Sequence, residues 1–103
     1  MLLTTIETLP EQKFTILGIA RGSTVQCKNF GRDFMAGLKN LVGGEMYEYT
    51  ELMDETRRIA TDRMIQDAER LGADAVIGMR YSSAEITQGA AEILAYGTAV
   101  KFL

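Results

Sequence analysis

Histidine is absent from this 103-residue sequence, and cysteine and proline each occur only once. Without histidine there is no Ser-His-Asp triad, and the commonest general base and the commonest transition-metal ligand are both missing. The single cysteine, Cys27, excludes an intrachain disulfide framework. Chemistry that needs histidine or paired cysteines is therefore excluded, which leaves carboxylates, lysines, arginines and one thiol.

Positive charge and long apolar runs are also scarce. Eleven Lys and Arg stand against fourteen Asp and Glu, a formal net charge of −3, whereas a nucleic-acid-binding surface needs clustered basic residues. Pro10 and the charged Glu7, Glu11 and Lys13 interrupt the first twenty residues, which is not typical of a signal peptide. No apolar stretch approaches the length of a membrane span. We expect a cytoplasmic protein with no nucleic-acid or membrane partner.

The length of the chain predicts one domain, residues 1–103, and an apolar fraction of 47% is enough for a packed core. Segment 13–22, "KFTILGIARG", has apolar residues in both alternating sets, which predicts a strand covered on both faces. Segment 23–28, "STVQCK", predicts a second, shorter strand. Further strands are predicted over 75–82 and 92–103, with a turn or loop around 86–90.

Two helices are predicted between these strands. Apolar residues at spacings of three and four predict a short helix over 31–42, which Gly43 and Gly44 end. A long helix over 45–71 has one apolar stripe and ends at Gly72 in a left-handed cap. The stripe comprises Tyr49, Leu52, Met53, Thr56, Ile59, Ala60, Met64, Ala68 and Leu71. Exposed ion pairs are expected for Asp54–Arg57, Asp54–Arg58 and Asp67–Arg70.

Small residues within the strands predict how the sheet packs. Glycine inside a strand usually marks the close approach of another backbone, so we expect the long helix to lie on the small-residue face. This face comprises Gly18, Ala20, Gly78, Ala95, Gly97 and Ala99. The opposite face is also apolar and comprises Leu17, Ile19, Ile77, Met79, Leu94, Tyr96 and Val100. Either the short helix or a second subunit must cover it, and we favour a homo-oligomer in which sheet edges or faces meet.

The stretch "GLKNLVGG" at 37–44 resembles a phosphate loop only superficially. It lacks the Gly-Lys-Ser/Thr ending of a Walker loop, and no G-x-G-x-x-G follows a strand. Free amides at Gly43 and Gly44 are one candidate anion site, but Glu45 already complements the dipole of the helix that follows. A tight turn between helices is the preferred interpretation. Gly37, inside a predicted helix, predicts that a helix, a strand or a neighbouring subunit packs against it.

Few other residues are candidates for chemistry. Cys27 is most simply a small apolar side chain, although one cysteine per subunit near an oligomer axis would form a ring of thiolates that suits soft metals. The carboxylates of the long helix are explained by a solvated face. Arg32, Lys39 and Arg80 are candidate anion contacts, and Asp33 with Lys39 forms an acid/base pair only if the fold brings them together.

Three blocks of the sequence resemble the YbjQ family of small bacterial proteins over about nine-tenths of the chain. They are "NFGRDFMAGLKNLVGGEMYEYTELMDETRRIA", "AERLGADAVIGMRY" and "EILAYGTAVKF". The resemblance implies an α+β subunit in which a small antiparallel sheet packs against one long and one short helix, similar to a dodecin subunit. It also implies a ring-shaped homopentamer, with short extra strands near 2–6 and 23–28 that help assembly.

The family is often labelled as heavy-metal-binding, but its biochemical role is not established. Where some members have a basic or small pair after the double glycine, this sequence has Glu45-Met46, which disfavours an anion site at that turn. We therefore expect a non-catalytic homopentamer that acts as a scaffold or binds a small ligand. The alternatives are metal binding through Cys27 or symmetry-repeated carboxylates, and an enzyme with an inter-subunit site near Arg32, Asp33 and Lys39.

Overall fold

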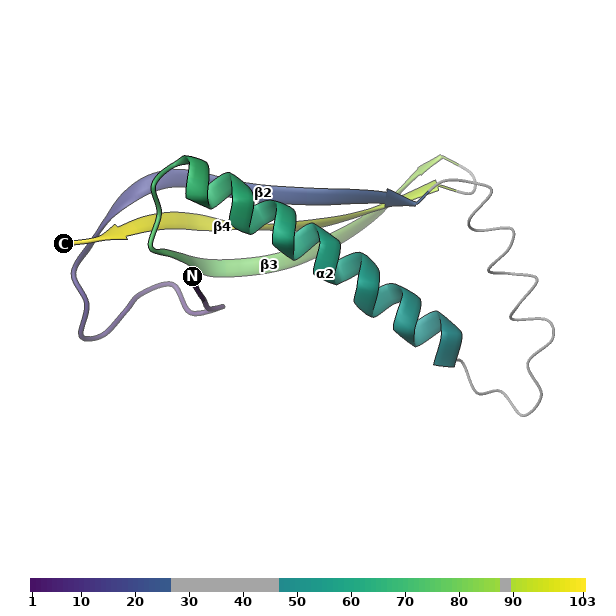
Figure 1. Ribbon diagram of the computed structural model, residues 1–103, viewed down its shortest axis with the longest axis horizontal. Helices are drawn as coiled ribbons and strands as arrows, with labels where there is room; N and C mark the ends of the chain where they lie inside the picture. Colours follow the sequence, from purple (N-terminus) through teal and green to yellow (C-terminus); the bar gives the residue numbers. More distant parts are fainter. Residues whose placement is uncertain (27–46, 88–89) are drawn as a thin grey trace.

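A four-stranded sheet with one long helix on one face forms the body of the protein (Figure 1). The computed structural model describes residues 1–26, 47–87 and 90–103. The strands are β1 (Leu2–Leu3), β2 (Phe14–Gln26), β3 (Ala75–Thr87) and β4 (Ala90–Phe102), and the helix is α2 (Tyr47–Arg70). The strand order is β1-β3-β4-β2. The predicted short helix over 31–42 lies outside the described residues.

The sheet is mixed, and this corrects the expectation of an antiparallel sheet. β3 and β2 both pair antiparallel with β4, but β1 pairs parallel with β3 through Leu2↔Ala75 and Leu3↔Val76. The predicted strands 13–22 and 23–28 are one continuous strand as far as Gln26. β3 and β4 are also longer than predicted, so that β3 reaches Thr87 and β4 starts at Ala90. Only residues 88–89 of the predicted turn remain between them.

Helix α2 packs on the small-residue face of the sheet, as predicted, and lies mainly across β2 and β4 (Figure 1). Its buried residues Thr56, Ala60, Met64 and Ala68 follow one stripe, and Met64 is fully buried. They meet a sheet surface of small and branched side chains. These are Ala20, Val76, Met79, Ile93, Ala95 and Ala99. Small residues in the strands therefore let the helix backbone come close to the sheet.

The helix ends at Gly72 in a left-handed cap, as predicted, and the hydrogen bonds around it form a Schellman motif. The Ala73 N–H donates to the Ala68 carbonyl at 3.1 Å and the Gly72 N–H donates to the Glu69 carbonyl at 2.9 Å. Gly72 has a φ of 82°, which is the left-handed conformation that favours glycine at this position. Leu71, predicted as the last residue of the buried stripe, is instead 42% exposed, because the chain already turns away from the helix there.

Two β-bulges change which face each side chain occupies. In β2 the register shifts between Ile16 and Gly18, and in β3 it shifts between Ile77 and Arg80. Both bulges contain a glycine with positive φ, Gly18 at 140° and Gly78 at 60°. Since a one-residue shift turns a strand over, simple alternation assigns residues wrongly on one side of each bulge.

The bulges therefore correct the predicted faces. Leu17 and Met79, assigned to the face opposite the helix, pack in the helix-side core. Phe14, which strict alternation along 13–22 places on the same face as Ala20, packs instead in a second cluster on the other side of the sheet. This second cluster contains Ala75, Ile77 and Val100 with the partly buried Leu9, Phe14 and Phe102.

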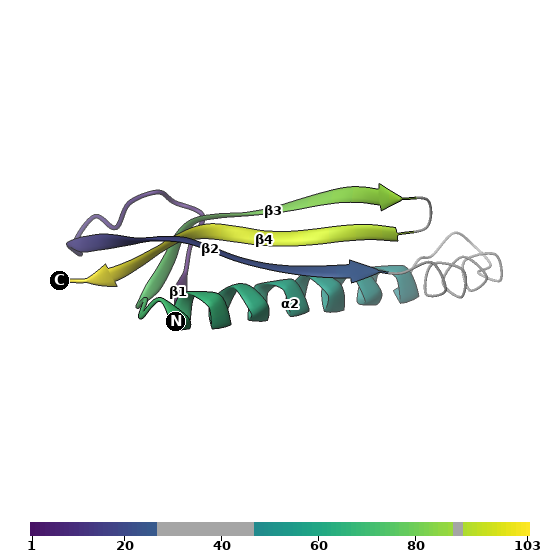
Figure 2. The ribbon, with the colours of Figure 1, turned by 90° about the horizontal axis from the view of Figure 1, so that it is seen from above.

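The N-terminal segment covers one end of the outer face, which is the face of the sheet opposite α2. Figure 2 shows the residues between β1 and β2 on this side, with α2 on the other side. Leu9 from this segment packs against the second cluster. The molecule is elongated, 54 × 27 × 16 Å, with a radius of gyration of 16.8 Å, where a compact domain of this length has about 13 Å. An elongated subunit exposes more surface than a compact one.

Candidate functional site: a pocket on the outer face and an open sheet edge

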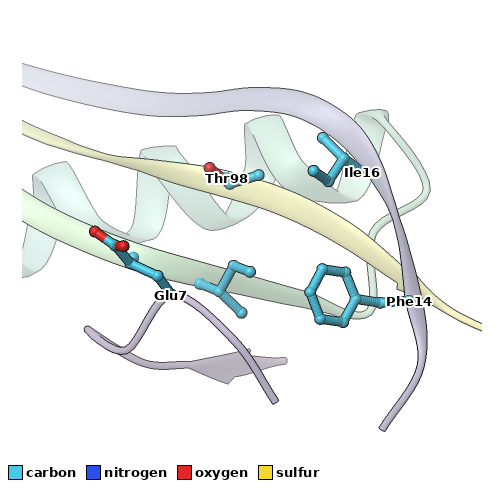
Figure 3. A pocket seen from close by; sticks show the side chains of 6 residues that line it. Glu7, Phe14, Ile16 and Thr98 are labelled. Atoms are coloured by element: carbon cyan, nitrogen blue, oxygen red, sulfur yellow. The ribbon is translucent and has the colours of Figure 1, made fainter. Parts of the chain in front are cut away.

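A hollow of about 350 Å³ lies on the outer face where the N-terminal segment meets the sheet (Figure 3). We call it the outer-face pocket. It is lined by Glu7, Phe14, Ile16, Ile77, Gly78 and Thr98. These residues come from the N-terminal segment and from β2, β3 and β4, so the pocket exists only when all four are assembled. Its volume is at the small end of the range for ligand sites in proteins.

Backbone hydrogen bonds hold Glu7 at this pocket. The Gly78 N–H donates to the Ile6 carbonyl at 2.7 Å, and the Met79 N–H donates to the Thr4 carbonyl at 3.0 Å. The Thr4 hydroxyl oxygen also accepts from the Ile6 N–H at 3.2 Å, which tightens the turn before Glu7. A Cβ atom at Gly78 would lie 3.5 Å from the Glu7 Cγ. The bulge at Gly78 therefore positions the acidic side chain directly over β3.

The other walls of the pocket are apolar, with one hydroxyl. Ile77 forms part of the floor and is 4% exposed, whereas Ile16 at the rim is 67% exposed. Thr98 lies opposite Ile77 in the β3–β4 ladder. Neither the Glu7 carboxylate nor the Thr98 hydroxyl forms an ion pair or a side-chain hydrogen bond with any residue that the structure describes. The pocket thus combines a free carboxylate and a free hydroxyl with an apolar floor.

A second hollow, of about 180 Å³, lies between α2 and the far half of the sheet. It is lined by Met53, Arg57, Tyr81, Ser82, Ser83 and Ile93. Its two largest polar side chains already have partners, because Arg57 pairs with Asp54 at 2.7 Å and the Tyr81 hydroxyl lies 2.7 Å from the Thr61 hydroxyl. We interpret this hollow as a packing feature of the helix–sheet interface.

The two outer edges of the sheet differ. At the β2 edge, α2 closes the backbone: the Arg21 N–H donates to the Asp67 carboxylate at 3.0 Å, and the Arg63 guanidinium donates to the Ser23 carbonyl at 2.6 Å. At the other edge, β1 pairs only with the first two residues of β3. Residues 81–85 of β3 are all exposed. The described part of the chain therefore leaves this stretch of β3 as an open edge.

The acidic side chains of α2 are neutralised locally. Arg58 hydrogen-bonds Glu55 and also pairs with Asp62 at 3.0 Å, and the contact with Arg58 lowers the pKa of Glu55. The same contact raises the pKa of Arg58. The predicted Asp54–Arg57 pair is present, but the predicted Asp54–Arg58 pair is wrong, because Arg58 turns to Glu55 and Asp62 instead.

Asp67 connects the helix to the sheet. The Arg21 backbone N–H lowers the pKa of Asp67, and Arg70 adds to this effect with a predicted ion pair at 2.9 Å. Among the residues that the structure describes, no three Cys, Asp or Glu side chains gather into a group that would hold a metal ion. The carboxylates of α2 therefore act as ion-pair partners and as a clasp on β2.

The residues selected from the sequence for chemistry lie mostly outside the described ranges. This applies to Cys27 and to six residues of the glycine-rich segment: Arg32, Asp33, Gly37, Lys39, Gly43 and Gly44. Arg80, a candidate anion contact, donates to the Thr5 and Met79 carbonyls, each at 2.8 Å. Its guanidinium is used to hold the N-terminal segment against β3.

Sequence reasoning did not find the outer-face pocket. Glycine at position 78 was the only signal, and it was interpreted as a close approach by α2 rather than by the N-terminal segment. Glu7 and Thr98 are 91 positions apart in the chain, and no local pattern connects them. Phe14 lies on the outer face because of the bulge in β2 between Ile16 and Gly18, which strict alternation does not reveal.

No helix among the described residues is long and apolar enough to cross a membrane. In the part of the chain that the structure describes, the fold defines a small α+β subunit with an open sheet edge at β3 and a ligand-sized pocket on its outer face. The chain belongs to the YbjQ family: the family model, whose description is "Putative heavy-metal-binding", matches residues 1–103.

Relatives with the same length support this assignment. The chain is 50% identical over 103 residues to a UPF0145 protein of Clostridium novyi, with 100% of both chains covered. It is 56% identical over 102 residues to a UPF0145 protein of Thermotoga maritima, covering 98% of this chain and 96% of the relative. A UPF0145 protein of the archaeon Archaeoglobus fulgidus is 50% identical, with 98% and 94% covered. The family therefore extends beyond the bacteria to which the sequence resemblance assigned it.

The fold also has a counterpart among solved structures. A crystal structure of a protein of unknown function from the DUF74 family of Pediococcus pentosaceus superposes with a TM-score of 0.67. The match covers 100% of this chain and 98% of the other, at 18% sequence identity. At this identity the likeness shows the α+β fold alone.

Proposed function

We propose that this protein is a non-catalytic subunit of a ring-shaped homo-oligomer, a homopentamer as the family resemblance implies, and that the open edge of β3 is part of the contact between subunits. The observation that carries the proposal is this edge. Residues 81–85 of β3 are exposed and pair with β4 on one side, but among the described residues no strand pairs with them on the other side. An unpaired edge strand is a template for pairing with another chain, and soluble proteins usually block such edges.

The contrast between the two edges supports self-assembly. At β2, Asp67 and Arg63 occupy backbone groups of Arg21 and Ser23, so that edge is protected within the subunit. The β3 edge has no equivalent clasp in the described chain. Because α2 already occupies the β2 edge, we expect the β3 edge of one copy to meet a different surface of the next copy, and such head-to-tail contacts form a ring when the rotation between neighbours closes.

The outer face adds exposed apolar side chains on β4 and on β2, the strand at the opposite edge from β3. Ile19 is 73% exposed, Val25 is 54% exposed and Tyr96 is 37% exposed. Tyr96 and Ile19 lie on the same face of neighbouring strands, since Ile19 pairs with Thr98 and Arg21 with Tyr96. Contiguous apolar surface of this kind usually marks a contact site in a soluble protein. A scaffold role, or binding of a small ligand, follows more readily from these features than catalysis does.

Sedimentation velocity and native mass measurement test the assembly. We expect wild-type protein at micromolar concentration to have a mass of about five times the 11.4 kDa chain. We expect Ala84→Lys, at the exposed edge of β3, to weaken assembly because a lysine at an edge disfavours strand pairing. Gln66→Lys, an exposed position on α2 with the same change of charge, is the matched control and should assemble normally. A monomeric wild-type protein, or an Ala84→Lys variant that assembles like wild type, would refute the proposal.

Metal binding is the second candidate, and the description of the family is what favours it. It rests on Cys27 and on carboxylates repeated by symmetry, since the described residues of one chain do not form a metal-binding group. Calorimetric titration of wild type and Cys27→Ser with Zn²⁺ and Cd²⁺ separates these versions. Loss of binding in the variant supports the thiolate ring, whereas equal binding assigns the ion to oxygen ligands.

A further inference from the structure

We propose that the outer-face pocket binds a small organic cation: an alkylammonium or guanidinium group attached to a short apolar chain. The pocket contains a single charged group, the Glu7 carboxylate, together with the Thr98 hydroxyl and the apolar side chains Phe14, Ile16 and Ile77. Figure 3 shows Glu7 on one side of the hollow, with Phe14 and Ile16 reaching it from β2 and Thr98 from β4. An ammonium head group and an apolar tail match this arrangement.

Charge selects a cation over an anion or a neutral molecule. The carboxylate of Glu7 repels an anion, and a neutral apolar ligand would remove water from it without supplying a donor. A cationic head group donates hydrogen bonds that both the carboxylate and the Thr98 hydroxyl can accept. Arg80 lies two residues beyond Gly78 in β3, but its guanidinium is held by the Thr5 and Met79 carbonyls and is not paired with Glu7.

The apolar part of the pocket is suited to the tail of such a ligand. Ile77 and Phe14 belong to the packed second cluster, so the floor is rigid, and Ile16 at the rim has much of its surface free for contact. The ring of Phe14 also offers an aromatic face, on which a cation is favoured over a neutral group. A single-atom metal ion would leave these apolar contacts unused.

The backbone conformation of Gly78 positions Glu7 at the pocket. Its φ of 60° is the conformation that side chains rarely adopt, and its N–H holds the Ile6 carbonyl that precedes Glu7. A Cβ atom at this position would make only an ordinary contact with the Glu7 Cγ, at 3.5 Å, so it is the left-handed backbone rather than a lack of space that favours glycine here. The bulge therefore has a role in the site that is separate from the packing of the helix.

Titration of the ¹⁵N-labelled full-length protein with butylammonium chloride, followed by amide chemical shifts, tests the proposal. We expect saturable shifts at Ile77, Gly78 and Thr98, with a Kd on the order of 1 mM, since the site is open and holds one ion pair. Butyrate and 1-butanol have the same carbon chain with a negative or no charge, and they should give no saturable shifts at these amides.

Two variants and a control identify the groups responsible. Glu7→Gln should weaken butylammonium binding by about three- to five-fold, as expected for loss of one exposed ion pair. Thr98→Val should weaken it as well, while Glu11→Gln, a carboxylate of the same segment outside the pocket, should leave it unchanged. The proposal is overturned if butylammonium gives no saturable shifts, if butyrate or 1-butanol binds equally well, or if Glu7→Gln binds as wild type does.

Discussion

The contact between β2 and the backbone of α2 at Gly22 provides the sharpest test of how this fold is packed. A Cβ atom at Gly22 would lie 2.2 Å from the Met64 nitrogen, 2.5 Å from the Ala60 carbonyl oxygen and 2.6 Å from the Arg63 carbonyl carbon. Real Cβ atoms essentially never come within 3.0 Å of such atoms. All three atoms belong to the helix backbone, so no side chain can rotate away. The Gly22→Ala variant must therefore move α2 as a whole.

The cost of this movement can be assembled from the contacts it disturbs. Overpacking of a well-packed core costs about 1–3 kcal/mol. The hydrogen bonds from the Arg21 N–H to the Asp67 carboxylate and from the Arg63 guanidinium to the Ser23 carbonyl would stretch, at about 1 kcal/mol together because both are exposed. The smaller conformational entropy of alanine in the unfolded chain offsets about 0.4–1 kcal/mol. We expect a net loss of about 1–3.5 kcal/mol, which lowers Tm by roughly 5–20 °C.

Gly72→Ala is the matched control for this experiment. Gly72 has a φ of 82°, and a Cβ atom added there would have no atom within 4 Å. The Gly72→Ala variant therefore has backbone strain but no steric clash. It should cost about 1–2 kcal/mol. Urea unfolding followed by circular dichroism, at one fixed protein concentration, compares the two variants. If Gly22→Ala is no less stable than Gly72→Ala, the close approach of α2 to β2 is not the reason for glycine at position 22.

Two further predictions concern side chains that join the helix to the sheet. Asp67→Asn should lower the free energy of unfolding at neutral pH. The pKa of Asp67 is lowered in the folded state, so wild type loses this advantage as pH falls below the ordinary value of 3.8, and the difference in unfolding free energy between the two proteins should close in acid. A difference that stays constant with pH would contradict the role of the Arg21 N–H. Tyr81→Phe removes a hydroxyl that lies 2.7 Å from Thr61 and should cost about 0.5–1 kcal/mol in a denaturant titration, whereas Tyr96→Phe should cost less; equal losses would contradict the Thr61 contact.

Local signals were enough to predict the elements themselves. The apolar stripe and the terminal glycine predicted α2 to within two residues at each end, because both depend only on neighbours in the chain. The alanines of the small-residue face were also correctly interpreted, because Ala20, Ala95 and Ala99 are fully buried against the helix. The glycines of that face were interpreted wrongly: an added Cβ atom would meet nothing at Gly18, Glu7 at Gly78 and Val76 at Gly97, rather than the helix. The predictions succeeded where burial follows the period of the element.

The predictions failed where two strands must be compared. Whether Leu17 or Met79 faces the helix depends on an extra residue relative to β4, and neither bulge can be recognised from one strand alone. The segment near 2–6 was expected to help assembly, and its parallel pairing with β3 of the same subunit was not predicted. A strand of two residues, Leu2–Leu3, has no periodicity of its own. The outer-face pocket depends on all of these features together, which is why it is absent from the sequence-based predictions.

Because β2 and β3 each contain a bulge, the number of residues in each strand is constrained as well as their identity. Deleting the extra residue at Gly78 would only restore regular alternation, whereas inserting one residue between Met79 and Arg80 would make every side chain beyond that point exchange faces, so that Tyr81 would leave the helix and Arg80 would enter the core. Insertions and deletions are therefore expected to be tolerated in the segment between β1 and β2, and selected against inside the long strands. Chain length within this sheet thus carries information that substitution patterns alone do not show.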